Sequence, residues 1–155
     1  MHYGLELASR EYTCMKEVEI ILKEMVKQGP WIKIYHWFEI EKTQGSGIEE
    51  NTLYHVDEIL NTLHNPTKGF YILEAILFAY PQKDDAEKEL DILTWKQYKE
   101  SKCSAAIVIF DGGWFEVYAK DPKNVDHIYE ELRKTNPKEM KFYSKTNMQR
   151  VGFYV

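Results

Sequence analysis

The segment from Ser104 to Tyr143 constrains the fold most, because it reads as a β-hairpin, a helix and a strand in close succession. Ala105 to Phe110 is a nearly continuous apolar run, and the Asp-Gly-Gly that follows it is rich in residues that tolerate positive φ. Trp114 to Lys120 then alternates between two faces, as a strand with one buried side does. Asp121-Pro122 is a typical start of a helix. This order of elements predicts the α+β class.

The rest of the chain predicts a mainly antiparallel sheet packed by three to four helices. Further strands are expected at Tyr3 to Leu7, Trp31 to Glu41, Phe70 to Tyr80, Glu139 to Tyr143 and Val151 to Val155. Helices are expected around the apolar stripe from Met15 to Met25, after Asn51 or Thr52, at the capping-box pair Thr94 and Gln97, and from Pro122 onward. Gln82 to Glu89 reads as a charged surface loop.

Length and composition favour one domain that spans residues 1–155 and has an ordinary globular core. The chain has 155 residues, of which 44% are hydrophobic and 29% charged, and the aromatic share of 14% is high. The formal charge of −5 argues against a nucleic-acid partner, because that class of binding needs clustered Lys and Arg.

The sequence shows no sign of export or of membrane insertion. No basic region followed by an apolar segment opens the chain, and no apolar stretch approaches the ~20 residues of a membrane span. Cys14 and Cys103 are too few and too far apart for a disulfide scaffold, and both read as inert thiols. We therefore expect a cytoplasmic protein without membrane contact.

Several short motifs in the C-terminal half carry a family resemblance. They are Tyr71-Ile72-Leu73, Phe78-Ala79-Tyr80-Pro81, Thr94 to Tyr98, Ser101-Lys102-Cys103, Val117 to Asp121, Ile128-Tyr129 and Thr146-Asn147. Over residues 69–147 the chain resembles an uncharacterised family of small bacterial proteins, catalogued as a domain of unknown function. The resemblance implies a small single-domain bacterial protein with no assigned activity, and it carries over no functional residue.

Among the polar residues, His36 and Glu74 are the candidates for chemistry. The sequence has no nucleotide-binding, hydrolase or metal-ligand motif, so we expect no cofactor and no metal. His36 lies on the strand face expected to carry Ile34 and Phe38, and Glu74 interrupts an apolar strand. Both residues read as ordinary hydrogen-bonded groups of the core or its rim. If they meet across the sheet, however, they form an acid–base pair.

The aromatic residues are more informative than the titratable ones. Alternation places Trp37 on one strand face with Trp31 and Tyr35, and it places Trp114 and Tyr118 together on another strand. Either these rings form a second core layer under a helix or a curled sheet, or they remain open as anchors of an interface. In the open case, the binding residues are Trp37, Glu39, Trp114, Glu116 and Tyr118.

Two functions follow from these residues. The first is a non-enzymatic protein-binding domain, similar to an inhibitor or immunity protein, that uses this aromatic-acidic face. The alternative is a small-molecule-binding protein or enzyme with a pocket around His36 and Glu74. A homodimer formed through an edge strand is compatible with either function.

Overall fold

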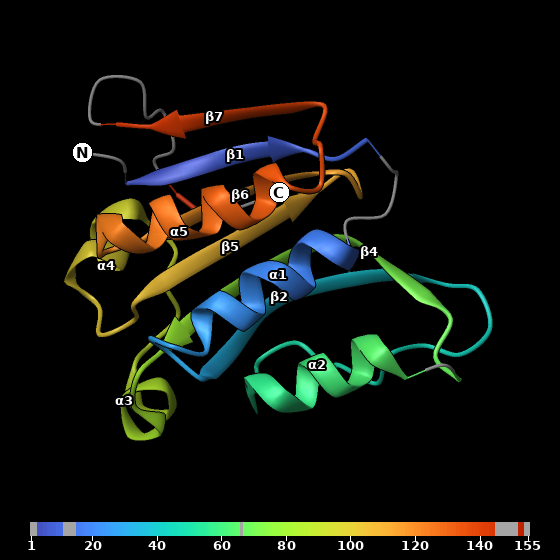
Figure 1. Cartoon of the computed structure of the whole chain (residues 1–155). Helices are drawn as coiled ribbons and strands as arrows, with labels where there is room; N and C mark the ends of the chain where they lie inside the picture. Colours follow the sequence, from blue (N-terminus) through green and yellow to red (C-terminus); the bar gives the residue numbers. More distant parts are fainter. Residues whose placement is uncertain (1–2, 11–14, 66, 145–151, 154–155) are drawn as a thin grey trace.

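The computed structural model describes residues 3–10, 15–65, 67–144 and 152–153, and the strands among them form one seven-stranded sheet (Figure 1). The strands are β1 (Gly4–Ala8), β2 (Trp31–Glu41), β3 (Thr52–His55), β4 (Phe70–Tyr80), β5 (Ala105–Phe110), β6 (Trp114–Ala119) and β7 (Glu139–Tyr143). Their order across the sheet is β3-β2-β4-β5-β6-β1-β7, and every neighbouring pair is antiparallel. The predicted α+β class with an antiparallel sheet is confirmed.

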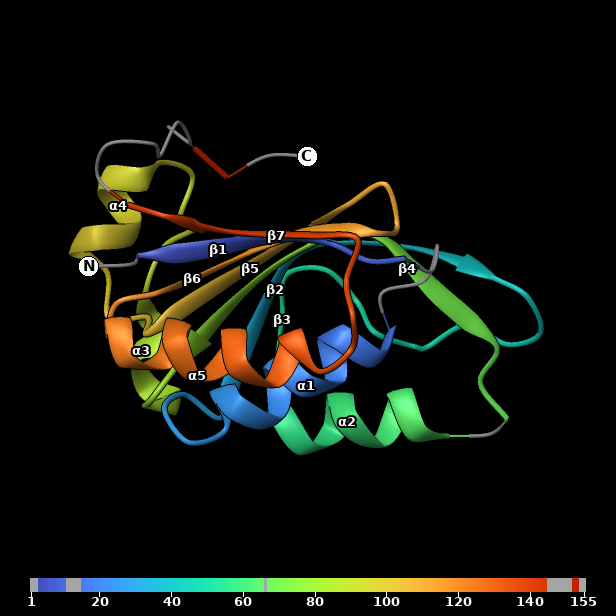
Figure 2. The ribbon, with the colours of Figure 1, turned by 45° about the horizontal axis from the view of Figure 1, so that its top comes forward.

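Helices lie on both sides of the sheet. The described helices are α1 (Met15–Met25), α2 (Val56–His64), α3 (Lys83–Lys88), α4 (Trp95–Glu100) and α5 (Pro122–Arg133). The three longest, α1, α2 and α5, cover one face side by side, and α4 lies on the opposite face (Figure 2). We call the first side the helix face and the other side the second face.

Each face has its own hydrophobic core. On the helix face, α1, α2 and α5 pack against inward residues of the sheet such as Leu5, Ile107 and Val117. On the second face, the cluster is smaller and more aromatic. Its members include Phe78, Tyr80, Ala86, Tyr98, Cys103, Tyr118, Tyr143 and Phe153. This second cluster occupies only part of its face, which leaves other sheet residues there accessible.

Several local predictions are confirmed at the level of single residues. Trp31–Glu41 and Phe70–Tyr80 are strands with the expected bounds. The hairpin turn uses positive φ at Asp111 (53°) and Gly112 (69°). Thr94 and Gln97 form a reciprocal capping box at the start of α4. The Asp121 side chain accepts a hydrogen bond from Lys123 N–H at the start of α5.

Two segments fold differently from the prediction. Thr52–His55 is strand β3, paired with the start of β2, so α2 begins only at Val56 and is capped by the His55 side chain. The Gln82 to Glu89 segment, predicted as a loop, contains α3, whose buried residue is Ala86. Cys14 lies outside the described residues. Of the strand predicted at Val151 to Val155, only residues 152–153 are described, and Gly152 forms an isolated bridge to Thr94.

A bulge in β2 decides which side chains meet on each face. Ile34 pairs with Leu77 and His36 pairs with Ile76, so Tyr35 is one extra residue on β2. Because successive strand residues point to opposite faces, this insertion reverses the alternation beyond it. His36 and Phe38 therefore share the second face with Ile76, while Ile34 points to the helix face.

Candidate functional site

Trp37 and Glu39 are not part of an exposed aromatic face. The bulge turns Trp37 onto the helix face, where its side chain joins the core and only 8% of the residue is exposed. Glu39 accepts hydrogen bonds from Trp37 Nε1 (2.8 Å) and from the backbone N–H of Ser46 (2.8 Å). The prediction that Trp37 shares a face with Trp31 and Tyr35 was wrong, because regular alternation across Tyr35 was assumed.

Glu116 and Tyr118 are on the second face but are buried. Their exposed fractions are 8% and 1%, and the Tyr118 hydroxyl donates a 2.7 Å hydrogen bond to Glu116 Oε2. Trp95 packs edge-on against Tyr118. These two residues therefore belong to the second core, and the contiguous patch predicted from Trp37, Glu39, Trp114 and Glu116 does not form.

Trp114 is the predicted aromatic binding residue that remains partly accessible. It is half-buried and stacks on Phe110 with 6.4 Å between ring centroids. Its side chain lines two adjoining hollows at the end of the sheet. Their other lining residues are Glu6, Ala8, Ser9, Arg10, Asp111, Gly113, Lys138, Glu139, Met140 and Lys141. Trp114 can therefore contact a molecule bound in either hollow.

The structure brings His36 and Glu74 together, as the acid–base hypothesis requires. His36 Nε2 lies 3.0 Å from Glu74 Oε2, and His36 Nδ1 lies 2.9 Å from Glu50 Oε1. Glu50 was not among the predicted residues; it reaches the site from the segment before β3 and also accepts a hydrogen bond from Trp37 N–H. A neutral imidazole has only one N–H, so both contacts are hydrogen bonds only when the ring is protonated.

Phe38 completes this group of residues. It lies opposite Glu74 in the pairing of β2 with β4, and 48% of it is exposed, which is unusual for a large apolar residue. Ala75 of β4 pairs with Ile109 of β5, so the next residues along these strands, Glu74 and Phe110, are neighbours. Phe110 in turn pairs with Trp114 of β6. We call the set His36, Phe38, Glu50, Glu74, Phe110 and Trp114 the open sheet surface.

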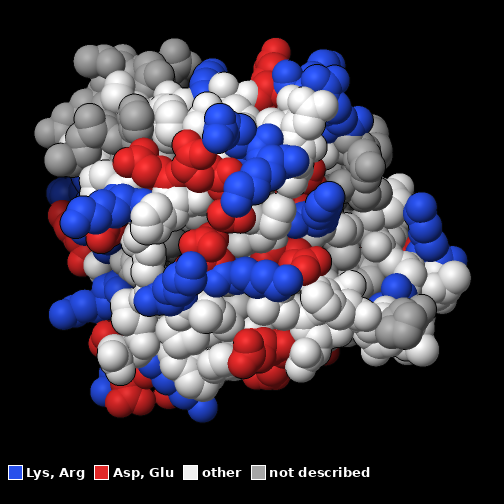
Figure 3. Space-filling view, in the orientation of Figure 1, with Lys and Arg blue, Asp and Glu red and all other residues white. Residues whose placement is uncertain are grey.

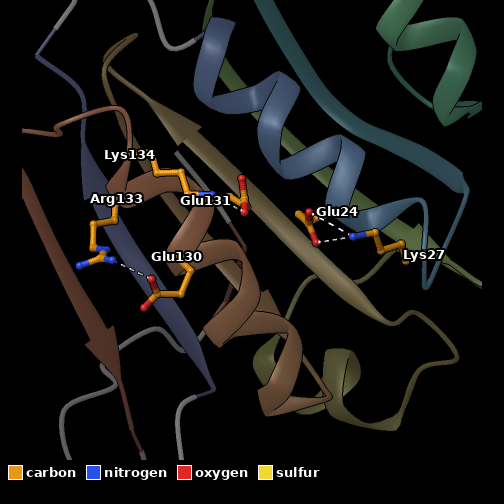
Figure 4. Close-up of polar contacts among 6 residues, drawn as sticks. All are labelled: Glu24, Lys27, Glu130, Glu131, Arg133 and Lys134. Atoms are coloured by element: carbon orange, nitrogen blue, oxygen red, sulfur yellow. Dashed lines mark hydrogen bonds and ion pairs between the residues drawn. The ribbon is translucent and has the colours of Figure 1, made fainter.

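The helix face differs from the open sheet surface in its charge pattern. Acidic and basic side chains are interspersed over it (Figure 3). Many are paired three positions apart at the C-terminal ends of α1 and α5, such as Glu24 with Lys27, Glu130 with Arg133 and Glu131 with Lys134 (Figure 4). Such pairs satisfy each other's charge and offer little net field to a partner.

Burial raises the pKa of two titratable groups of the second face, Cys103 and Tyr98. Burial raises the pKa of the Cys103 thiol to about 11, against the weaker lowering effect of its hydrogen bond with Ser101. Burial, with the nearby Cys103, also raises the pKa of Tyr98. A thiol that stays protonated at neutral pH is a poor nucleophile, which agrees with the inert role expected for Cys103.

Within the described ranges, no group of three or more His, Cys, Asp and Glu side chains is placed to hold a metal ion. In the same part of the chain, no helix is long and apolar enough to cross a membrane.

The fold and the site together define the class of this protein. The molecule is an α+β protein whose antiparallel sheet is covered by helices on one face and partly open on the other. The chain belongs to the family described as protein of unknown function (DUF2691), whose model matches residues 30–154. The match begins further toward the N-terminus than the motifs that suggested such a family. No curated protein and no solved structure matches the chain.

Proposed function

We propose that this protein is a non-enzymatic binding domain that recognises another protein through the open sheet surface. The observation that carries this proposal is the exposure of Phe38 beside a charged group, on the part of the second face that its core cluster leaves accessible. Half-buried aromatic residues are the typical anchors of protein interfaces, and Phe38 and Trp114 are two such residues on one face. The role is that of an inhibitor or immunity protein, which acts by covering a partner.

Charge supports the same reading. Glu50 and Glu74 contact His36, and none of the described Lys or Arg side chains pairs with either carboxylate. Together with the formal charge of −5, this favours a basic protein over a nucleic acid as the partner. Cys103 is a free thiol in the core, which is consistent with the proposed reducing cytoplasm of a bacterium.

The proposal is tested by capture of a partner with matched variants. Wild-type protein and the variants Phe38→Ala, Trp114→Ala and Val26→Ala are immobilised, and proteins retained from an extract of the source cells are compared. Val26 is the control because it is an exposed apolar residue just after α1 and belongs to neither core cluster. We expect a protein that wild type and Val26→Ala retain and that the other two variants lose. Equal retention by all four proteins would contradict the proposal.

A second function, binding or conversion of a small molecule at His36 and Glu74, is favoured by their 3.0 Å contact. Against it, both ring nitrogens face carboxylates, so a substrate can reach a ring nitrogen of His36 only after one of these contacts breaks. A thermal-shift screen of metabolites distinguishes the two functions. A compound that stabilises wild type and Trp114→Ala but not His36→Gln would favour the small-molecule site.

A homodimer remains a further proposal, because β3 and β7 are the edges of the described sheet. Its test is the molar mass in solution by light scattering, and a monomeric mass at all protein concentrations would exclude it.

A further inference from the structure

On the open sheet surface, two carboxylate oxygens have no hydrogen-bond donor among the residues that the structure describes. His36 uses Oε2 of Glu74 and Oε1 of Glu50, and Oε1 of Glu50 also accepts the Trp37 N–H. Among the described residues, nothing donates to Oε1 of Glu74 or to Oε2 of Glu50. The side chains are accessible, with exposed fractions of 35% for Glu74 and 45% for Glu50. Each of the two partly exposed carboxylates that contact the imidazole therefore has one oxygen to which no described residue donates.

The charge of this group is negative even when the imidazole is protonated. One imidazolium offsets one of the two carboxylates, and about one negative charge is left. A cationic side chain of a partner would offset that remaining charge and donate to the free oxygens. The group is thus complementary to a cation.

Phe38 decides which cation fits best. Its ring lies next to Glu74 in the strand pairing and is half exposed. A guanidinium group is planar, so it can stack on an aromatic ring while it donates sideways to a carboxylate. An ammonium group is a compact charge without a flat face, so it gains less binding free energy from contact with an aromatic ring.

We infer that the open sheet surface takes an arginine side chain of its partner, stacked on Phe38 and hydrogen-bonded to Glu74 and Glu50. The inference rests on the proposed function, since it names the chemistry of the partner at that surface. Trp114 lies on β6, at the other end of the open sheet surface. It then contacts a neighbouring apolar part of the same partner.

The test uses a capped tripeptide, acetyl-Gly-Arg-Gly-amide, titrated into the isotopically labelled full-length protein and followed by amide NMR shifts. The matched probes contain lysine or the neutral arginine analogue citrulline in place of arginine. We expect the arginine peptide to shift the amides of His36, Phe38 and Glu74 first, and the citrulline peptide to shift them little. Glu74→Gln with Glu50→Gln should weaken binding roughly fivefold to tenfold.

The control is the double variant Glu130→Gln with Glu131→Gln, which changes the net charge equally but lies on α5. It should bind the arginine peptide as wild type does. Phe38→Leu should remove the preference for arginine over lysine. Shifts that map elsewhere, an equal loss in the α5 control, or equal binding of citrulline would each overturn the inference. If a captured partner is lost by Phe38→Ala but retained by the Glu50 and Glu74 variants, the arginine site fails while the proposed function stands.

Discussion

His36 Nε2 lies 3.0 Å from Glu74 Oε2, although the two residues are 38 positions apart in the chain and lie on different strands. The bulge at Tyr35 makes this contact, because it turns His36 onto the face that Glu74 occupies. With Glu50 on the other ring nitrogen, His36 holds two carboxylates on one open surface. The contact therefore holds the two side chains side by side and leaves negative charge available to a partner.

The His36–Glu74 pair should contribute little to stability. Both side chains are about one-third exposed, so the coupling free energy between His36→Gln and Glu74→Gln should be only about 0.5–1 kcal/mol. Urea unfolding of wild type, both single variants and the double variant measures it. The exposed pair Lys83 and Glu87, at 3.8 Å, is the control and should couple less. A coupling free energy several times larger would mean that the pair mainly stabilises the fold and is not a binding group.

Tryptophan quenching should separate Trp37 from Trp114. Trp37 is 8% exposed under the helices, whereas Trp114 is half-buried beside two hollows. We expect acrylamide and iodide to quench Trp114 more strongly than Trp37, as assigned from single Trp→Phe variants at both positions. Stronger quenching of Trp37 would contradict the placement of the β2 bulge.

Cys103 should be slow to alkylate in the folded protein. Its raised pKa of about 11 keeps the thiol protonated at about pH 8, and only 1% of the residue is exposed. A Cys14→Ser background isolates Cys103, and iodoacetamide labelling followed by mass spectrometry measures the rate. Labelling should become fast only in denaturant. A fast reaction of the folded protein at that pH would mean that the second core opens readily.

The raised pKa of Cys103 also predicts how the free energy of unfolding changes at alkaline pH. A group whose folded pKa lies above its unfolded value stabilises the folded state fully below the unfolded value, and the effect is lost as pH rises toward the folded value. The free energy of unfolding should therefore fall between the ordinary thiol pKa of 9.0 and about pH 11. Cys103→Ala should flatten part of that fall, which urea unfolding at several pH values would detect.

Gly4→Ala should destabilise the sheet. A Cβ at Gly4 would lie 2.6 Å from Tyr118 Cδ1 and 2.7 Å from the carbonyl oxygen of Val117, so the backbone of β1 or β6 must shift. We expect a loss of about 1–3 kcal/mol in the free energy of unfolding. Gly47→Asn is the control, since no atom lies within 4 Å and asparagine tolerates its positive φ of 80°. Equal effects of the two changes would mean that β1 and β6 are less closely packed than described.

The sequence predicted those elements whose signals are local. The bounds of β2 and β4, the hairpin turn at Asp111 and the cap of α5 by Asp121 follow from alternation, turn chemistry and capping. The start of α2 could not be predicted, because Thr52–His55 is drawn into strand pairing with β2. α3 has one buried residue, Ala86, and so lacks a helical stripe to read.

The site was less accessible to prediction than the fold. The contact of His36 with Glu74 was stated as a condition and is met, but the exposed aromatic residue is Phe38 rather than Trp37. One inserted residue at Tyr35 causes this exchange, and nothing in the alternation of β2 marks it. Glu50 reaches His36 from the segment before β3, and such a contact depends on the path of the chain rather than on a pattern.

The central claim, that a protein partner covers the open sheet surface, is tested most directly by photo-crosslinking in the source cells. A photoreactive phenylalanine analogue, p-benzoylphenylalanine, is incorporated at position 38 in one strain and at position 26 in another, since both positions are exposed. We predict a discrete adduct of one mass from position 38 that weakens when Trp114→Ala is added, and none of that mass from position 26. No adduct from position 38, or the same adduct from both positions, would contradict the claim.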